Sequence, residues 1–401
     1  MKHSINDLAL FGGRPAFDSV RPISNLLRPD IERFLNYTES IYHSNQSYCD
    51  GGLVQQMEGR FAQLHGTKHC ISFCSGFMAL MVAMHVCALP GKTEVVMPSL
   101  TYRRMADIAA WTGLIPHFCD VDKVSLGMTS ESAAKAVNEN TALILGVHPI
   151  TNLCDIDGLE ALSQEYNIPL VFDAVEAAYA EHNGKMVGSY GKAEGFSFHA
   201  SKLLNGFEGG YLTTNDGFLA EELRCVRNFG FAGNNSNMVR IGLNANLSEL
   251  HAAMAMACLD ILPEHIEQNR ARHNAWQKIL AELPSLTLLL YSDTERRGYK
   301  NVLVRCEDSW PLSRDNTLRI LHAENMLARP LYNPPLHQSS REFSTACSSD
   351  MSVTEEVTMK YILLPSGEFV SVEDISIMGS VLSFLHQNAV EINSRIERQN
   401  R

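Results

Sequence analysis

One lysine of the sequence stands in a setting that could make it a nucleophile. Lys202 follows the apolar run GFSFHA (195–200), and Glu208-Gly209-Gly210 comes six residues after it. Short or polar side chains flank the amine, at Ser197, His199 and Ser201. The paired glycines allow a close backbone approach, and a lysine held in such a pocket can lose its proton and attack a carbonyl group. A solvated surface lysine is the alternative interpretation of this residue taken alone.

An aspartate upstream of Lys202 could complete a cofactor site. Asp173 closes the apolar run IPLVFDA (168–174), and ligands of open α/β sheets bind at the carboxyl ends of such strands. A buried carboxylate needs a cation, and the protonated ring nitrogen of pyridoxal 5′-phosphate (PLP) would be one. A Schiff-base lysine with an acidic partner for the ring nitrogen is how proteins hold PLP. An aspartate that merely caps the next helix is the alternative.

Two further segments could contact the phosphate and the ring of such a cofactor. Ser75 and Gly76 separate a strand (69–73) from an apolar helix (78–89), and N–H groups at a helix start attract anions. Tyr102 follows a strand (94–98) and a turn, where its ring could stack on a planar group. Each feature also has an alternative when taken alone. The turn at Ser75 and Gly76 could bind no ligand, and Tyr102 could simply pack at the border of the core.

These residues need a sheet to position them, and the chain predicts one. Strands alternate with helices through the first two thirds, which indicates an α/β fold whose mostly parallel sheet lies between helices. The expected strands are 69–73, 94–98, 141–148, 168–174, 195–200 and 209–214. The last three follow each other without long helices, so one of them is expected to run antiparallel.

A long helical pattern in the sequence contains Pro263, and a mixed pattern of strands and helices follows it. Because proline lacks a backbone donor, we expect Pro263 to break the helix. We therefore expect a large domain over 14–262 and a smaller C-terminal α+β domain over 263–401, with residues 1–13 packing on the latter. The polar tail 393–401 is expected to fray.

Composition narrows the function classes. Lys and Arg number 33 against 45 Asp and Glu, a net charge of −12, which argues against a nucleic-acid partner. The ten cysteines show no zinc spacing, so no metal is expected, and free thiols suit a reducing cytoplasm. The longest apolar stretch, 79–89, is too short to span a bilayer, and the N-terminus has no signal-peptide core. A soluble cytoplasmic enzyme is expected, without a membrane partner.

Taken together, SFHASK…FEGG, VFDAVEAA and CSGFMAL resemble the PLP-dependent sugar aminotransferases of the DegT/StrS type. The resemblance covers nearly the whole chain and implies the aspartate aminotransferase architecture, fold type I. It makes Lys202 the lysine that forms the Schiff base with PLP. It also pairs Asp173 with the ring nitrogen and places Glu176 beside the ring.

The resemblance assigns the other cofactor contacts as well. Ser75, Gly76 and Phe77 form the phosphate turn, Tyr102 stacks on the ring, and Ser197 becomes a stronger phosphate ligand because Phe77 replaces the more usual Thr. GLNANLSELHAA matches a segment that reaches the neighbouring subunit's site, so Asn244 or Asn246 could contact the phosphate across a homodimer interface with shared active sites. An ordinary loop role for these asparagines is the alternative.

Within the family the closest likeness is to 4-aminotransferases of dTDP-4-keto-6-deoxyglucose, carried by EVVMPSLTY, SFHASK with FEGG, and ARPLYNPPLHQ. L-Glutamate would be the amino donor, with pyridoxamine phosphate as the intermediate cofactor form. The expected substrate contacts are His148, Tyr332 and His337. Lys185, Arg240 and Arg329 are candidate partners of the nucleotide diphosphate, and a solvated surface charge is the alternative for each of these three. The segment Thr151–Cys154 departs from the aromatic–Gly pair common in relatives, which leaves its contacts open.

Three alternatives remain: a 3-aminotransferase, an enzyme of cyclitol or aminoglycoside precursors, and a non-catalytic PLP-binding regulator. Retention of Lys202, Asp173 and Glu208 together argues against the regulator. O-antigen (lipopolysaccharide) assembly and secondary-metabolite glycosylation would both use the expected product, so the sequence does not name the pathway.

Overall fold

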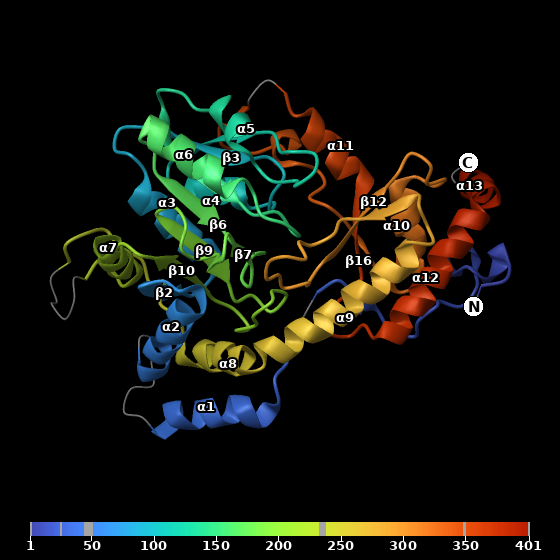
Figure 1. Ribbon diagram of the computed structural model, residues 1–401, viewed down its shortest axis with the longest axis horizontal. Helices are drawn as coiled ribbons and strands as arrows, with labels where there is room; N and C mark the ends of the chain where they lie inside the picture. The colour runs from blue at the N-terminus through green and yellow to red at the C-terminus, as the bar shows by residue number, and fades with distance from the viewer. Residues whose placement is uncertain (1, 25, 44–50, 232–237, 348–349, 400–401) are drawn as a thin grey trace.

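The computed structural model describes residues 2–24, 26–43, 51–231, 238–347 and 350–399. These residues form a large unit around an eight-stranded sheet and a smaller unit around a four-stranded sheet, with a long helix running from one unit to the other (Figure 1). No helix in the described ranges is long and apolar enough to cross a membrane.

The large unit places helices on both faces of its sheet. Its strands are β2 (His69–Phe73), β3 (Glu94–Pro98), β4 (Ile115–Cys119), β5 (Thr141–Val147), β6 (Leu170–Asp173), β9 (Ala193–Ser197), β10 (Gly210–Thr214) and β15 (Ala346–Cys347). Its helices are α1 (Ile31–His43), α2 (Gly52–His65), α3 (Gly76–Cys87), α4 (Met105–Trp111), α5 (Ser130–Ala134), α6 (Ile156–Tyr166), α7 (Gly217–Arg227) and α8 (Glu249–Asp260). A short hairpin joins β7 (Glu181–His182) to β8 (Lys185–Met186).

The strand order of the large sheet is β15-β4-β3-β5-β6-β9-β10-β2. All neighbours pair in parallel except β10, which is antiparallel to both β9 and β2. The mostly parallel sheet and its one antiparallel member are therefore confirmed. Because β10 runs the opposite way, its first residue, Gly210, lies opposite both Phe73 and Ser197, the last residues of β2 and β9.

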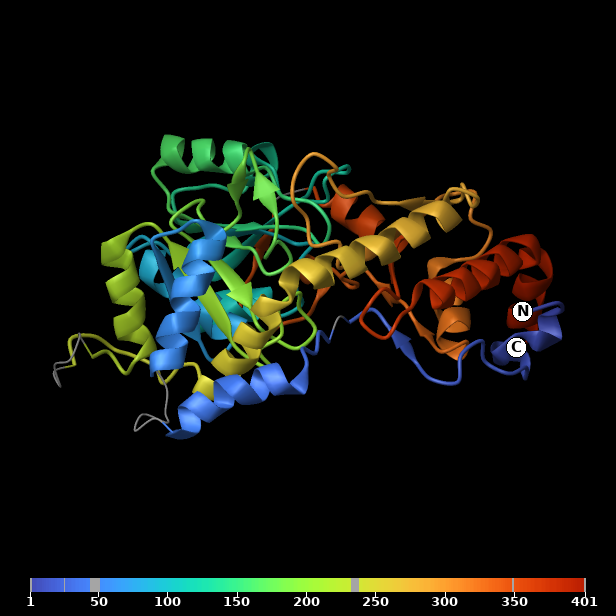
Figure 2. The same cartoon turned by 60° about the horizontal axis from the view of Figure 1, so that its bottom comes forward.

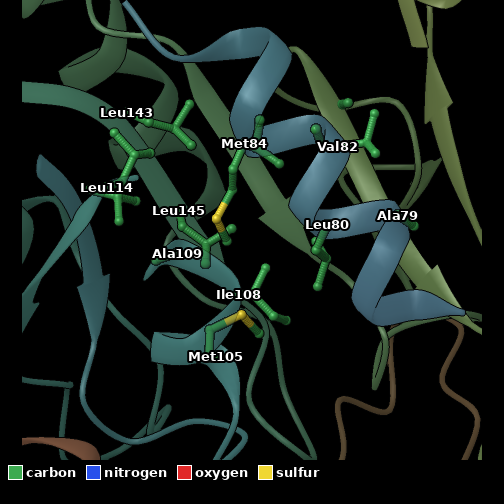
Figure 3. Packing of buried hydrophobic residues seen from close by; sticks show 14 of the residues in the cluster. Ala79, Leu80, Val82, Met84, Met105, Ile108, Ala109, Leu114, Leu143 and Leu145 are labelled. Atoms are coloured by element: carbon green, nitrogen blue, oxygen red, sulfur yellow. The ribbon is translucent and has the colours of Figure 1, made fainter. Parts of the chain in front are cut away.

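The core consists of one apolar layer on each face of this sheet. Leu143 and Leu145 of β5 pack on α3 and α4, while Ile144 faces α6 on the other side. Figure 3 shows Met84 of α3 pointing toward Leu145 of β5. Each such buried aliphatic side chain stabilises the fold by roughly 1.5–3 kcal/mol relative to exposure, so the sheet is a rigid base for loops at its edge.

The small unit is built from the C-terminal third and the N-terminal segment. Its sheet has the order β11 (Leu286–Leu288), β12 (Val302–Cys306), β16 (Tyr361–Leu364), β14 (Arg329–Pro330). Its helices are α9 (Leu262–Leu280), α10 (Arg314–Ala323), α11 (Ser352–Lys360), α12 (Val372–Gln387) and α13 (Ala389–Gln399). The remaining elements are the turns η1 (Ile5–Asp7), η2 (Ala9–Phe11) and η3 (Leu336–Gln338), and the pair β1 (Arg21–Pro22) with β13 (Met326–Leu327).

The N-terminal segment is held against the small unit, beside α13 (Figures 1 and 2). Ile5 and Leu8 share a core with Ile392 and Ile396, and the buried carboxylate of Glu324 accepts hydrogen bonds from the Ala9 and Ala16 amides. The expectation of a frayed tail is wrong for its described part, because two isoleucines four residues apart give α13 an apolar face that the small unit buries.

Two details differ from the sequence-based expectations. The strand β4 was not predicted, and the C-terminal region returns to the large unit, where β15 pairs with β4 and Leu336 and Met351 join its core. The break at Pro263 is confirmed, since α8 ends at Asp260 and the proline occupies the first turn of α9. The domain boundary itself stays a prediction.

Candidate functional site

The candidate site lies where several strands of the large sheet end. Asp173 is the last residue of β6 and Ser197 the last of β9, while Ser75 follows β2 by two residues. These strands are parallel to one another, so their carboxyl ends share one edge of the sheet, and ligands of open α/β sheets bind at such an edge. Lys202 follows β9 in a turn in which its amide donates to the carbonyl of His199.

An ion-pair cluster occupies this edge. The Lys202 amine lies 2.5 Å from Oε1 of Glu176, and the Lys300 amine lies 3.0 Å from Oε2 of the same carboxylate. The Asn301 side-chain amide also donates to Oε2, at 3.2 Å, and to the carbonyl of Ile150. The Glu176 carboxylate is thus held from the large unit by Lys202 and from the small unit by Lys300 and Asn301.

Burial and charge set the protonation of this cluster. Burial would raise the pKa of Glu176, but the ammonium groups of Lys202 and Lys300 outweigh it and hold that pKa well below its usual range. Burial would lower the pKa of Lys202, but the carboxylates of Glu176 and Asp173 raise it. Burial lowers the pKa of Lys300, although Glu176 opposes the shift, and the charge of Lys202 lowers it further.

Asp173 is a nearly buried carboxylate that lacks a close cation. Its Oδ1 accepts the amide N–H of Val175 at 3.0 Å, and no other hydrogen bond to its side chain is present in the described ranges. Burial raises the pKa of Asp173 to about 6, while the Val175 amide and the Lys202 charge oppose the shift. A protonated ring nitrogen would supply the missing cation, so this residue fits the role that the sequence predicted.

The start of α3, the end of β9 and the start of β10 approach one another closely beside this cluster, and we call the space that they border the cradle. A Cβ placed on Gly76 would lie 2.9 Å from Cβ of Ser197, and one placed on Gly210 would lie 2.5 Å from the backbone of Gly76. The Ser75 side chain caps α3 by accepting the Met78 amide. In the described part of the chain this leaves the first-turn amides of Gly76 and Phe77, with the Ser197 hydroxyl nearby, available to an anion such as a phosphate.

Tyrosines from both units surround the cluster. Tyr102 follows β3, is 47% exposed, and lies close enough to Lys202 to influence the pKa of its amine. Tyr332, in the loop after β14, has its pKa raised by burial and by the charges of Glu176 and Asp173. The loop of Tyr332 is attached to the sheet edge through His337, whose Nδ1 lies 2.7 Å from the Ser99 hydroxyl.

A narrow recess borders Glu176 and Lys300. Its walls come from Thr151, Asn152 and Leu153 on one side and Tyr291, Tyr299 and Lys300 on the other. The segment that departs from the family pattern therefore borders the site directly.

Among the described residues, four other predicted side chains make no hydrogen bond or ion pair with Lys202, Glu176 or Lys300. His148 is 2% exposed, stacks on Phe172 and lies 3.3 Å from the Cys154 sulfur, so its side chain belongs to the core and does not face the recess. Arg240 forms an ion pair with Glu222. Lys185 in β8 and Arg329 in β14 are exposed.

The two candidate asparagines differ in their surroundings. The Asn246 amide donates to Asn228 Oδ1 at 3.1 Å, whereas Asn244 is exposed. The carbonyl of Ala245, between them, accepts the amide of Cys74, so this segment lies beside the start of the phosphate cradle.

Lys300 and Asn301 were not predicted as site residues. Their only sequence signal is their position just before the strand 302–306, where a lysine is ordinarily solvated. The packing of the small unit on the large one brings them to Glu176.

Comparisons with known proteins identify the family of this chain. A model of the DegT/DnrJ/EryC1/StrS aminotransferase family matches residues 29–382. A dTDP-4-amino-4,6-dideoxy-D-glucose transaminase of Shigella dysenteriae is 27% identical over 340 residues, which cover 84% of this chain and 91% of the relative. A GDP-perosamine synthase of Caulobacter vibrioides is 28% identical over 327 residues, covering 81% of this chain and 88% of the relative.

Solved structures are similar as well. The crystal structure of DesI in the presence of its TDP-sugar product has a TM-score of 0.91 at 32% identity and covers 98% of this chain and 100% of that chain. That of 3-amino-5-hydroxybenzoic acid synthase, at 21% identity and a TM-score of 0.81, covers 92% and 98% and shares the fold. The predicted fold type I is confirmed. The chain belongs to the DegT/DnrJ/EryC1/StrS aminotransferase family and is a PLP-dependent aminotransferase.

Proposed function

We propose that this aminotransferase moves the amino group of L-glutamate onto the 4-keto carbon of dTDP-4-keto-6-deoxyglucose, giving dTDP-4-amino-4,6-dideoxyglucose. The main support for amino transfer is the position of Lys202. Its amine lies at the sheet edge beside Glu176 and near the buried Asp173. The similarity to the Shigella dTDP-sugar transaminase and to DesI, which was crystallised with a TDP-sugar, supports a dTDP-linked sugar.

Lys202 is the residue that handles the proton. Its amine, once neutral, would accept the proton of the donor α-carbon as a base and then, as an acid, would deliver that proton to C4′ of the cofactor. PLP, when bound, supplies an aldehyde for the amine and a protonated ring that stabilises negative charge at the reacting carbon. Asp173 would keep that ring nitrogen protonated, because a buried anion favours a positive partner.

The phosphate of the cofactor would occupy the cradle of Ser75, Gly76, Phe77 and Ser197. Amide N–H groups at the start of α3 and the Ser197 hydroxyl are donors suited to a dianion. Phe77 contributes its backbone amide and no side-chain hydroxyl, so Ser197 is the nearby hydroxyl of the cradle that would take its place. Tyr102 would cover the ring from the exposed side.

The sugar nucleotide would enter over the junction between the units. Tyr332 and His337 border that junction, and the exposed Lys185 and Arg329 have charge available for a diphosphate. Arg240 could bind the diphosphate only if its ion pair with Glu222 were broken. His148 remains in the core and is not part of this binding proposal.

We further propose a homodimer in which Asn244 reaches the phosphate of the partner's cofactor. The exposed side chain of Asn244 supports it over Asn246, whose amide is engaged with Asn228. A dimeric enzyme with the same activity in the Asn244→Ala variant would argue against this contact.

A GDP-linked keto sugar is the second candidate substrate. It is favoured by the Caulobacter relative, which is as similar to this chain as the Shigella one. Turnover assays with the two nucleotide sugars at equal concentration distinguish the candidates.

The first test is the visible spectrum of the protein with PLP, before and after excess L-glutamate. We expect a band from the cofactor bound at Lys202 that glutamate bleaches and dTDP-4-keto-6-deoxyglucose restores. A band that glutamate leaves unchanged would contradict the amino donor. Restoration by the GDP sugar alone would move the proposal to that substrate.

A further inference from the structure

Glu176 is shared by two lysines, of which only Lys202 has a part in the chemistry above. Lys300 approaches the other carboxylate oxygen from a position two residues before the start of β12. Its side chain is 12% exposed, as is that of Glu176, so the pair is largely shielded from water. An ammonium group is rarely buried to this extent unless it is paired, which indicates a specific role for Lys300.

The need for a second cation follows from what Lys202 must do. A lysine attacks a carbonyl or accepts a proton only as a neutral amine, so Lys202 has to give up the charge that balances Glu176. A buried glutamate without a cation takes up a proton, since its pKa can rise to about 8–9. A protonated Glu176 would offer Lys202 a hydrogen-bond donor where the resting structure offers an acceptor.

We propose that Lys300 is a positioning residue, the fixed counter-ion that keeps Glu176 ionised and directed at Lys202 whenever the Lys202 amine is neutral. This role rests on the proposed function, because it matters only if Lys202 cycles between its charged and neutral forms. Burial lowers the pKa of Lys300, and the Glu176 carboxylate, 3.0 Å from its amine, opposes that shift.

The other groups facing Glu176 do not replace Lys300. Asp173 is an acid, and Tyr291 and Tyr332 are held neutral because burial raises the pKa of each. Arg297, which lines the same recess, has its guanidinium paired with Glu295 at 2.8 Å. In the described ranges, Lys202 and Lys300 are the cations within ion-pair distance of Glu176.

The test is a pH titration of the visible absorption of the protein loaded with PLP. The Lys300→Gln variant keeps a donor but loses the charge, so Glu176 should take up a proton and add a titration step in the range of roughly pH 6–9 that the wild type lacks. The Lys300→Arg variant keeps the charge and should titrate like the wild type. The double variant Glu176→Gln/Lys300→Gln has no carboxyl group to titrate, so the added step should vanish.

The matched control is Lys278→Gln, which removes an exposed lysine of α9 and should titrate like the wild type. An unchanged curve in Lys300→Gln, or an added step that persists in the double variant, overturns the role of Lys300. If Lys300→Gln does not fold, Lys300→Arg decides: a wild-type curve supports the counter-ion, and an added step overturns it. A wild type that forms no band with PLP overturns the proposed function and this role together, whereas a normal wild-type band with an unchanged Lys300→Gln curve overturns this role alone.

Discussion

A Cβ added to Gly210 would lie 2.5 Å from both the backbone nitrogen and the Cα of Gly76. The start of β10 and the first turn of α3 are therefore in direct backbone contact. This contact brings the α3 amides next to Ser197, and it explains why the second residue of the glycine pair in the FEGG motif has no side chain.

The Gly210→Ala variant should consequently damage the phosphate cradle. The methyl group overlaps Gly76 and the Phe196 carbonyl, both backbone, so α3 must move, at a cost of about 1–3 kcal/mol in unfolding free energy. We expect PLP affinity to fall at least ~10-fold, equal to about 1.4 kcal/mol. Absorbance titration with PLP and urea unfolding measure the two effects.

Gly59→Ala is the matched control for this substitution. Gly59 lies within α2 with no atom near the added Cβ, so the change should stabilise the helix by about 1 kcal/mol and leave PLP affinity unchanged. Equal PLP affinity in Gly210→Ala and in the wild type would show that the cradle does not hold the phosphate.

Replacing Lys202 should separate binding from chemistry. In Lys202→Ala the cradle and Asp173 remain, so PLP should still bind without a covalent bond, while turnover falls by at least ~10²–10⁴-fold through loss of the base. Borohydride reduction followed by mass spectrometry should find PLP attached to Lys202 in the wild type and nothing attached in the variant. Turnover in Lys202→Ala near the wild-type rate would remove this residue from the mechanism.

Asp173 should lower the unfolding free energy of the apoprotein at neutral pH and strengthen the binding of PLP. Burial raises its pKa in the folded chain to about 6 from the ordinary 3.8, so the folded apoprotein holds its proton more tightly than the unfolded chain does. The stability contributed by this group is present below pH 3.8 and is lost as pH rises through about 6, a change of roughly 3 kcal/mol.

The Asp173→Asn variant removes this titration. Without PLP it should be more stable than the wild type at pH 8 and approach it at pH 4, yet it should bind PLP more weakly because the ring nitrogen loses its anion. Urea unfolding at both pH values and a PLP titration at pH 8 measure this. A variant that is less stable than the wild type at pH 8 would contradict the raised pKa.

The part of the site that could be predicted from the sequence is the part that lies just beyond strand ends. Asp173, Ser197 and Lys202 follow apolar runs, and parallel strands bring such positions to one edge, so local pattern and topology suffice. The single antiparallel strand was likewise indicated by the missing helices between 168 and 214.

Lys300 and Glu194 could not be predicted, because tertiary packing alone distinguishes them from solvated charges. Lys300 reaches Glu176 only when the small unit packs on the large one. Glu194 sits in β9 at a position that the sheet buries completely. His148 was expected at the substrate, but its strand end turns the ring into the core against Phe172.

Glu194 provides a last prediction, on the pH dependence of stability. Its Oε2 accepts the Tyr190 amide, and its Oε1 lies 3.6 Å from His148 Nε2. Burial raises the pKa of Glu194 to about 8 and lowers that of His148 to about 3, so the folded pair is neutral at pH 7. On unfolding, Glu194 releases a proton above its ordinary pKa of 4.5, whereas His148 takes one up below 6.5.

Between pH 4.5 and 6.5 these two proton changes cancel, and from pH 6.5 to about 8 only that of Glu194 remains. In this upper window the wild type should lose about 1.4 kcal/mol of unfolding free energy per pH unit from this group. Glu194→Gln should remove that slope, whereas Glu397→Gln, an exposed change on α13, should keep it. Urea unfolding of the apoproteins at pH 6.5, 7.2 and 8 measures the slopes. Equal slopes in Glu194→Gln and the wild type would mean that Glu194 is ionised in the folded chain and paired with a charged His148.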